Sequence, residues 1–264
     1  MRELGSVLVC YSGGVDSAFV LAVAHAELGE RAVGMTAVSP SLPELEREEA
    51  CSIARAMGAD HRLVDSSEID DPAYVANNAD RCFHCKSELY RVAVAKRREW
   101  QFEHILNGTN VDDLGDYRPG LEAAAQAGVL SPLVELGFSK ADVREGALAL
   151  GLGIWDKPAS ACLSSRIPYG TSVTRERLAQ IGGLERVLRA ELGFRQVRVR
   201  YHDAVARVEV ELGELPRAFE AGVRERIVDA GLAHGFKFVT VDLAGYRMGS
   251  QNELLVGRSL RVVS

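Results

Sequence analysis

In the first 150 residues, two kinds of segment, each with its own arrangement of apolar and polar positions, follow one another along the chain. Short apolar runs, often β-branched, are typical of strands that are buried on both faces of a parallel sheet. They occupy residues 6–11, 32–38, 61–64 and 104–106. Longer segments with helical periodicity occupy residues 18–28, 42–57, 87–100 and 139–150. Strands and helices in this alternation predict an α/β fold with a doubly wound parallel sheet.

A different pattern begins after about residue 170. Thr174 is a suitable N-cap for a helix that continues to Leu192. Two stretches that alternate apolar and polar residues then predict antiparallel strands, and a helix and a last strand follow. These elements are expected at 196–201, 206–212, 216–234 and 236–243. We therefore predict a domain of residues 1–168 and a smaller α+β domain of residues 169–264, which would serve substrate binding and oligomerisation.

Composition and charge narrow the range of functions. The chain has 264 residues and a net charge of −6, which disfavours nucleic acid as a partner because nucleic-acid binding needs a basic face. Apolar runs such as 18–24 are far shorter than the roughly 20 residues of a membrane span, and residues 1–5 lead into a strand without a signal-peptide pattern. We expect a cytoplasmic protein whose five cysteines are thiols, metal ligands or catalysts.

A glycine loop follows the first predicted strand. In Ser12-Gly13-Gly14-Val15-Asp16-Ser17, backbone N–H groups and a helix N-terminus favour a bound phosphate. Ser12 and Ser17 add hydroxyl groups, whereas Asp16 would repel a phosphate unless Mg²⁺ bridged the two. The loop has neither the lysine ending of a Walker A motif nor the Gly-x-Gly-x-x-Gly spacing of dinucleotide folds.

The loop resembles the PP-loop of the ATP pyrophosphatase family. That resemblance implies that ATP binds here by its β- and γ-phosphates, so that pyrophosphate leaves and AMP passes to an oxygen of the substrate. Such a step depends mainly on positioning and charge neutralisation. The implied ATP-binding residues are Ser12, Gly13, Gly14, Asp16 and Ser17. The simpler interpretation is a glycine-serine turn that caps a helix.

A polar segment follows the fourth predicted strand. Because ligands bind at the carboxyl edge of an open α/β sheet, we expect Asn107, Gly108 and Thr109 to contribute to the nucleotide site. An Asx turn without a ligand would also explain the polar residues. The segment contains Asn107, Gly108, Thr109, Asn110, Asp112, Asp113, Asp116 and Arg118.

Three cysteines are candidates for chemistry. Cys82 and Cys85 form a Cys-x-x-Cys motif, which fits a redox pair, half of a zinc site or chance. Together with Cys162, which has Ser and Arg neighbours, they could hold a 4Fe-4S cluster with one iron open to hydrosulfide, a nucleophile toward an adenylate. Cys10 and Cys51 are expected to be small core residues.

The run Ala-Ser-Ala-Cys-Leu-Ser-Ser-Arg-Ile-Pro-Tyr-Gly at 159–170 resembles the signature of the LarE family. Members are ATP-dependent sulfur transferases that make the nickel-pincer nucleotide cofactor of lactate racemase. The likeness spans nearly the whole chain, and its other parts are residues 12–17, 107–120, 155–158 and 245–250.

The LarE resemblance implies a PP-loop domain, a small C-terminal domain and a hexamer. It implies adenylation of the carboxylates of pyridinium-3,5-biscarboxylic acid mononucleotide with ATP and Mg²⁺, and their conversion to thiocarboxylates, with Asp16 and Cys162 as catalytic residues. Some members sacrifice the sulfur of the cysteine that corresponds to Cys162. Others carry a 4Fe-4S cluster on the counterparts of Cys82, Cys85 and Cys162. We favour the cluster because all three cysteines are present, and place the sacrificial route second.

Arg198 and Arg200 alternate with apolar residues, so both face one side of a predicted strand. Paired guanidinium groups suit a phosphate, and the LarE resemblance places the substrate phosphate on these two arginines. The simpler interpretation is a solvated charged face.

Three other functions fit parts of the pattern. A PP-loop tRNA thiolase would also use three cysteines, but the acidic charge and the surroundings of Cys162 disfavour it. An amide-forming synthetase that uses ammonia would not need those cysteines. A nucleotide sensor would bind ATP without releasing pyrophosphate.

Overall fold

The structure, a computed structural model, describes residues 1–114, 119–158 and 160–247. The chain divides into two compact units, Met1–Ser160 and Ala161–Ser264. This division comes before the segment 161–168, which the sequence pattern had assigned to the first domain. The segment belongs to the second unit because its 3₁₀ turn, Leu163–Arg166, packs on elements of that unit.

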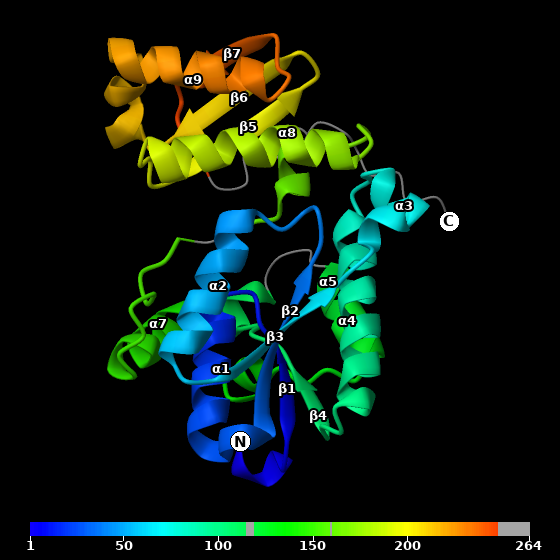
Figure 1. Ribbon diagram of the computed structural model, residues 1–264. Helices are drawn as coiled ribbons and strands as arrows, with labels where there is room; N and C mark the ends of the chain where they lie inside the picture. Colours follow the sequence, from blue (N-terminus) through cyan, green and yellow to red (C-terminus); the bar gives the residue numbers. More distant parts are fainter. Residues whose placement is uncertain (115–118, 159, 248–264) are drawn as a thin grey trace. The chain divides into compact units, whose positions relative to one another are not determined.

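The N-terminal unit is built on a four-stranded sheet in the order β3-β2-β1-β4 (Figure 1). Every neighbouring pair in it is parallel, so the predicted α/β fold is confirmed. The strands are β1 (Val7–Cys10), β2 (Ala32–Val38), β3 (Asp60–Asp65) and β4 (His104–Leu106).

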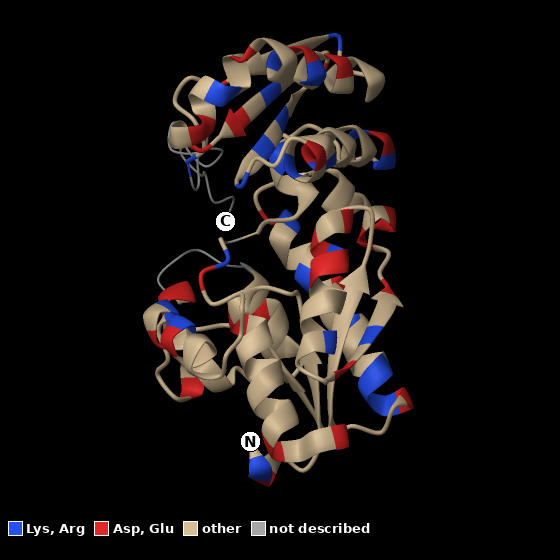
Figure 2. Cartoon of the chain, turned by 60° about the vertical axis from the view of Figure 1, so that its left-hand side comes forward, with Lys and Arg blue, Asp and Glu red and all other residues tan. Residues whose placement is uncertain are grey.

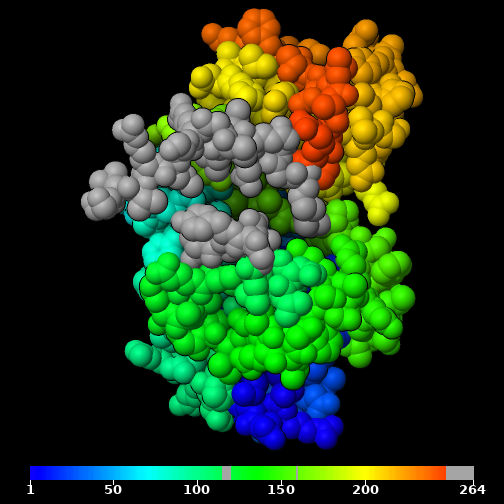
Figure 3. Space-filling model, turned by 180° about the vertical axis from the view of Figure 1, so that it is seen from behind, coloured from blue at the N-terminus to red at the C-terminus, as the bar shows by residue number. Residues whose placement is uncertain are grey.

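Helices cover both faces of this sheet. Val7 and Val9 of β1 pack with α1, α2 and α7, whereas Leu8 packs with α4 and α5 on the opposite face, as the alternation of side chains along a strand requires. The chain that follows β4, green in Figure 3, forms the back of this unit. The helices are α1 (Val15–Leu28), α2 (Glu44–Ala56), α3 (Pro72–Val75), α4 (Arg81–Glu99), α5 (Pro119–Gln126), α6 (Pro132–Glu135) and α7 (Lys140–Ala149).

The C-terminal unit has a three-stranded sheet in the order β5-β6-β7. The predicted antiparallel pair is confirmed, with Val199 opposite Val208, and β7 is parallel to β6. The elements are α8 (Arg175–Arg186), β5 (Val197–His202), β6 (Val205–Val210), α9 (Ala221–Ala233) and β7 (Phe238–Val241).

Several boundaries differ from the sequence predictions. The helix expected at 216–234 begins only at Ala221, because Pro216 lies in a separate 3₁₀ helix, Leu212–Phe219. The helix α4 begins at Arg81, earlier than expected, so the Cys-x-x-Cys motif lies in its first two turns. In the described part of the chain, no helix combines the length and apolar character of a membrane span.

Candidate functional site

The glycine loop connects β1 to α1, and its path requires glycine. Gly13 has a φ of 74°, and a Cβ there would lie 2.8 Å from the Cβ of Ala50 on α2. The backbone N–H of Ser12 donates to the hydroxyl of Ser17, and that hydroxyl donates to the Gly14 carbonyl, each at 3.1 Å. The two serines therefore fix the loop at the N-terminus of α1, where backbone N–H groups favour an anion.

Asp16 lies in the first turn of α1, where its Oδ1 accepts a hydrogen bond of 2.9 Å from Nδ2 of Asn110. Burial raises the pKa of the Asp16 carboxyl, the Asn110 bond opposes this effect, and the nearby Asp113 carboxylate adds to it. A half-buried carboxylate of this kind gains stability from a bound cation. The position therefore fits a ligand of Mg²⁺.

The polar segment after β4 packs directly on the glycine loop. A Cβ at Gly108 would lie 2.6 Å from the backbone nitrogen of Ser17, so only glycine allows this approach. Asn107 accepts a hydrogen bond of 3.1 Å from the N–H of Thr109 through Oδ1. Its buried Nδ2 makes no hydrogen bond of standard geometry in the described part of the chain, although the amide acts on the Tyr90 hydroxyl, where it opposes the rise in the tyrosine pKa that burial causes. The structure thus brings residues 107–109 and 12–17 together.

The acidic residues of that segment connect it to α7. Asp112 accepts a hydrogen bond of 2.7 Å from the backbone N–H of Lys140, and Asp113 lies 3.2 Å from Nζ of the same lysine. Ser139 caps α7, as predicted, by accepting from the N–H of Asp142. Asp116 and Arg118 lie outside the described residues.

Lys157 contacts the glycine loop, and sequence reasoning missed it. Its Nζ donates to the carbonyl oxygen of Gly13 at 3.2 Å and is paired with Glu46 and Glu49 of α2. The only signal in the sequence was the motif Trp155-Asp156-Lys157-Pro158, which carried the family resemblance without a role for the lysine.

Cys82 and Cys85 lie three residues apart in the first two turns of α4, so they share one side of the helix. Cys82 is exposed and Cys85 is partly buried. His84 lies between two carboxylates, with Nδ1 3.4 Å from Asp71 and Nε2 3.6 Å from Asp80. Among the described residues, no group of three or more His, Cys, Asp and Glu side chains is placed to hold a metal ion.

Cys10 and Cys51 are both partly buried. Burial raises the pKa of the Cys10 thiol to about 12, although the ammonium group of Lys86 opposes this effect. The Cys10 side chain therefore stays a neutral thiol at physiological pH, which is the state expected of a packing residue.

Cys162 lies in the C-terminal unit, in a backbone turn that Arg166 holds. Nη1 of Arg166 donates to the carbonyl oxygens of Ala161 at 2.7 Å and of Cys162 at 3.0 Å. The Arg166 side chain is 1% exposed and forms an ion pair with Glu185 on α8, with Nε 2.9 Å from Oε1. The polar neighbours of Cys162 therefore include an arginine that shapes the backbone around the thiol.

Arg198 and Arg200 lie on one face of β5, and each is only 7% exposed (basic residues are blue in Figure 2). Arg200 binds both carboxylate oxygens of Glu209, at 3.0 and 2.9 Å. The guanidinium of Arg198 lies 5.2 Å from the ring centre of Tyr246. Burial lowers the pKa of Arg198, with Arg166 acting in the same direction. The simpler interpretation of a solvated charged face is therefore wrong.

One hydrogen bond connects this arginine face to the turn of Cys162. Nη1 of Arg200 donates to the carbonyl oxygen of Ser165 at 2.9 Å. The hydroxyl of Ser165 in turn donates to the carbonyl oxygen of Cys162 at 2.8 Å. A group bound by the arginines would therefore lie beside the segment that carries the thiol.

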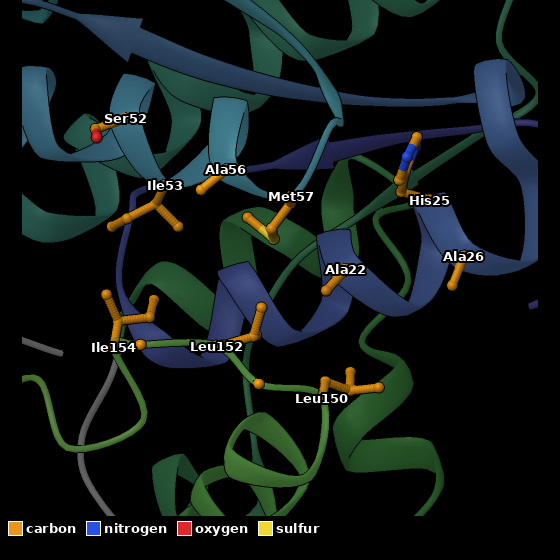
Figure 4. A pocket seen from close by; sticks show the side chains of 12 residues that line it. Ala22, His25, Ala26, Ser52, Ile53, Ala56, Met57, Leu150, Leu152 and Ile154 are labelled. Atoms are coloured by element: carbon orange, nitrogen blue, oxygen red, sulfur yellow. The ribbon is translucent and has the colours of Figure 1, made fainter.

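An open cavity of about 580 Å³ lies elsewhere in the N-terminal unit (Figure 4). Ile53 of α2, Met57 at the C-cap of that helix, Leu152 and Ala22 of α1 lie around it. None of the predicted site residues lines this cavity, and we assign it no role in the site.

Comparison with known proteins finds relatives that match over most of the chain. No family model matches the chain. A protein of Lactiplantibacillus plantarum named pyridinium-3,5-bisthiocarboxylic acid mononucleotide synthase is 35% identical over 98% of this chain and 94% of its own length. An uncharacterized protein of Synechocystis is 44% identical over 96% of the chain and 94% of its own length. An uncharacterized protein of Methanocaldococcus jannaschii is 27% identical over 91% of this chain and 90% of its own length.

Proposed function

Because the chain belongs to the LarE family of pyridinium-3,5-bisthiocarboxylic acid mononucleotide synthases, we propose that it makes that thiocarboxylate product from the corresponding biscarboxylic acid mononucleotide. The observation that carries the proposal is the 35% identity to the synthase over 98% of the chain. The chain is accordingly a sulfur-transferring enzyme of nickel-pincer nucleotide biosynthesis.

We propose that ATP binds at the glycine loop in the first half-reaction. A carboxylate oxygen of the substrate attacks the α-phosphorus, the bond to the β-phosphate breaks, and pyrophosphate leaves. The loop residues and Asn107 would bind the outer phosphates, and Asp16 would bind Mg²⁺, which neutralises charge on the leaving group. The close approach of the loop to α2 at Gly13 and the packing of Gly108 against the backbone of Ser17 support this assignment.

In the second half-reaction, a sulfur nucleophile attacks the acyl carbon and AMP leaves with its phosphate. We propose that Arg198 and Arg200 bind the substrate phosphate meanwhile. Their burial supports this role, because a desolvated guanidinium interacts strongly with a phosphate. The bond from Arg200 to Ser165 also places this face beside the Cys162 turn.

For the sulfur source, we propose a 4Fe-4S cluster on Cys82, Cys85 and Cys162. The shared helix side of Cys82 and Cys85 supports them as two ligands of one centre. An iron without a cysteine ligand would supply a binding site for hydrosulfide. In the alternative route, Cys162 gives up its own sulfur and becomes dehydroalanine.

Anaerobic purification separates these routes. The cluster predicts about four irons per chain and repeated turnover. The sacrificial route predicts one turnover and the loss of hydrogen sulfide from Cys162 in the intact mass. We also propose a cytoplasmic location, where ATP and reduced thiols are available, and a hexamer, which light scattering of the purified protein would test.

The experiment that tests the function is direct. The purified protein is incubated without oxygen with Mg·ATP, sulfide and the biscarboxylic acid mononucleotide. We expect pyrophosphate release that depends on the mononucleotide, and mass spectrometry should detect the thiocarboxylate. Pyrophosphate release that depends on tRNA instead, or product without ATP consumption, would contradict the proposal.

A further inference from the structure

Three segments of the N-terminal unit meet at the ammonium group of Lys157. Its Nζ is 3.2 Å from the carbonyl oxygen of Gly13, 2.9 Å from Oε2 of Glu46 and 2.8 Å from Oε2 of Glu49. The two glutamates lie three residues apart on α2, and therefore on one side of that helix. One cation thus joins the glycine loop, α2 and the segment that precedes Ala161.

The surroundings of Lys157 make its charge important. The Lys157 side chain is 13% exposed and that of Glu46 is 6% exposed, so solvent screens this group weakly. Glu49 is the more exposed of the two glutamates that pair with Lys157, with 41% of its side chain exposed to solvent. Without the ammonium group, two carboxylates would lie beside a loop that we assign to a triphosphate, and they would repel it.

The backbone of the lysine segment is also fixed. Arg144 of α7 donates from Nη1 to the carbonyl oxygen of Trp155 at 3.0 Å and from Nη2 to that of Lys157 at 3.2 Å. At the other end of the glycine loop, Asn110 holds the Asp16 carboxylate. The loop is therefore held at both ends by side chains that come from distant parts of the sequence.

We propose that Lys157 is a positioning residue for nucleotide binding. It holds the Gly13 carbonyl against α2, so that the N–H groups of the loop stay in place, and it neutralises Glu46 and Glu49. It acts through the loop, since two carboxylates already bind its charge. This inference rests on the proposed function, because it assumes that the glycine loop binds the triphosphate of ATP.

The test compares full-length variants by substrate-dependent pyrophosphate release at varied Mg·ATP. Lys157→Met is expected to raise the KM for ATP about tenfold or more, with kcat within about threefold, because the loss is in binding. Lys157→Arg should stay within about threefold of wild type because it keeps the charge. The matched control is Lys96→Met, since Lys96 pairs with Glu99 on α4, away from the loop.

A double variant isolates the role of charge. Adding Glu49→Gln to Lys157→Met should recover part of the lost ATP affinity, because one repelling carboxylate is gone. Glu49→Gln alone should lower the KM for ATP by about twofold. It keeps the inference testable if Lys157→Met does not fold, which a thermal melt would show.

The outcomes distinguish the two claims. If the wild-type protein releases no pyrophosphate with its substrate, the proposed function fails. If the wild type is active and Lys157→Met has an unchanged KM for ATP, the inference about Lys157 is overturned. It is also overturned if Glu49→Gln has a higher KM for ATP than the wild type, or if the double variant has a higher KM for ATP than Lys157→Met.

Discussion

The two regions that we propose bind phosphate groups are built from different parts of the polypeptide. In the N-terminal unit, the glycine loop offers backbone N–H groups at the start of α1, and its side chains mainly fix the path of the chain. In the C-terminal unit, β5 offers the side chains of Arg198 and Arg200, and Glu209 of β6 binds the second of these.

This difference has consequences for folding and for function. A loop of backbone donors needs glycine where the chain comes close to other atoms, and Asp16 is the one charged residue among 12–17. A face of buried guanidinium groups needs carboxylate partners, and removal of one charge leaves the other uncompensated. Substitutions in the glycine loop should therefore affect activity more than stability, whereas those on the arginine face should affect both.

The largest effect is expected at Cys162, beside the arginine face. Cys162→Ala should abolish formation of the thiocarboxylate, because either sulfur route needs this thiol. The first turnover of pyrophosphate release should stay within about threefold of wild type, because the thiol takes no part in ATP binding or in AMP transfer. Mass spectrometry of the product and a pyrophosphate assay measure the two steps. Cys51→Ala is the matched control and should keep both pyrophosphate release and thiocarboxylate formation.

In the glycine loop, Asp16→Asn should lower pyrophosphate release by about 100-fold or more, because the proposed Mg²⁺ ligand loses its charge. The fold should survive, since the amide oxygen of the introduced side chain can still accept the hydrogen bond from Asn110. A variant that releases pyrophosphate at the wild-type rate would contradict the role of Asp16.

The stability of the same variant depends on pH in a defined direction. Burial raises the pKa of the Asp16 carboxyl, so its charged form costs folding free energy above that pKa. The cost disappears as pH falls through the raised pKa. Without ATP and Mg²⁺, Asp16→Asn should therefore melt at or above the wild-type Tm at pH 7, and the gain should vanish toward about pH 4. A difference in Tm between Asp16→Asn and the wild type that grows as the pH falls would contradict this account.

On the arginine face, Arg198→Met should raise the KM for the mononucleotide about 10- to 100-fold, because one charge-assisted contact to its phosphate is lost. The KM for ATP should not change. Arg224→Met is the control, since Arg224 is an exposed residue of α9 that pairs with Glu225. Equal changes in both KM values would show that the arginine acts on the whole fold.

The smallest effect is expected where the polar segment meets the glycine loop. Gly108→Ala would place a Cβ 2.6 Å from the backbone nitrogen of Ser17. We expect a cost of about 1–3 kcal/mol in unfolding free energy and a KM for ATP raised several-fold. Gly153→Ala, where no atom lies within 4 Å of the added Cβ, is the control for denaturant unfolding. Matching stabilities of the two variants would contradict the close packing.

The sequence predicted the parts of the fold that depend on local pattern. The four parallel strands, the antiparallel pair in the second half, and Ser139 and Thr174 as helix caps all appear in the structure. The start of α9 could not be placed, because Pro216 is compatible both with a helix start and with the separate 3₁₀ turn that is found.

Side-chain partners from distant segments could not be predicted. The periodicity of β5 indicated that Arg198 and Arg200 share a face, but not that the face is buried or that Glu209 binds it. The contacts of Lys157 with Gly13, and of Arg166 with the Cys162 carbonyl, join residues whose proximity only the folded chain defines.

The central claim is that a carboxylate of the mononucleotide attacks ATP at the α-phosphorus. A substrate labelled with oxygen-18 in its carboxylates tests this directly, with mass spectrometry of the AMP released during sulfur transfer. The account predicts that each AMP carries one labelled oxygen from the substrate. Unlabelled AMP, with thiocarboxylate formed in the same reaction, would contradict it.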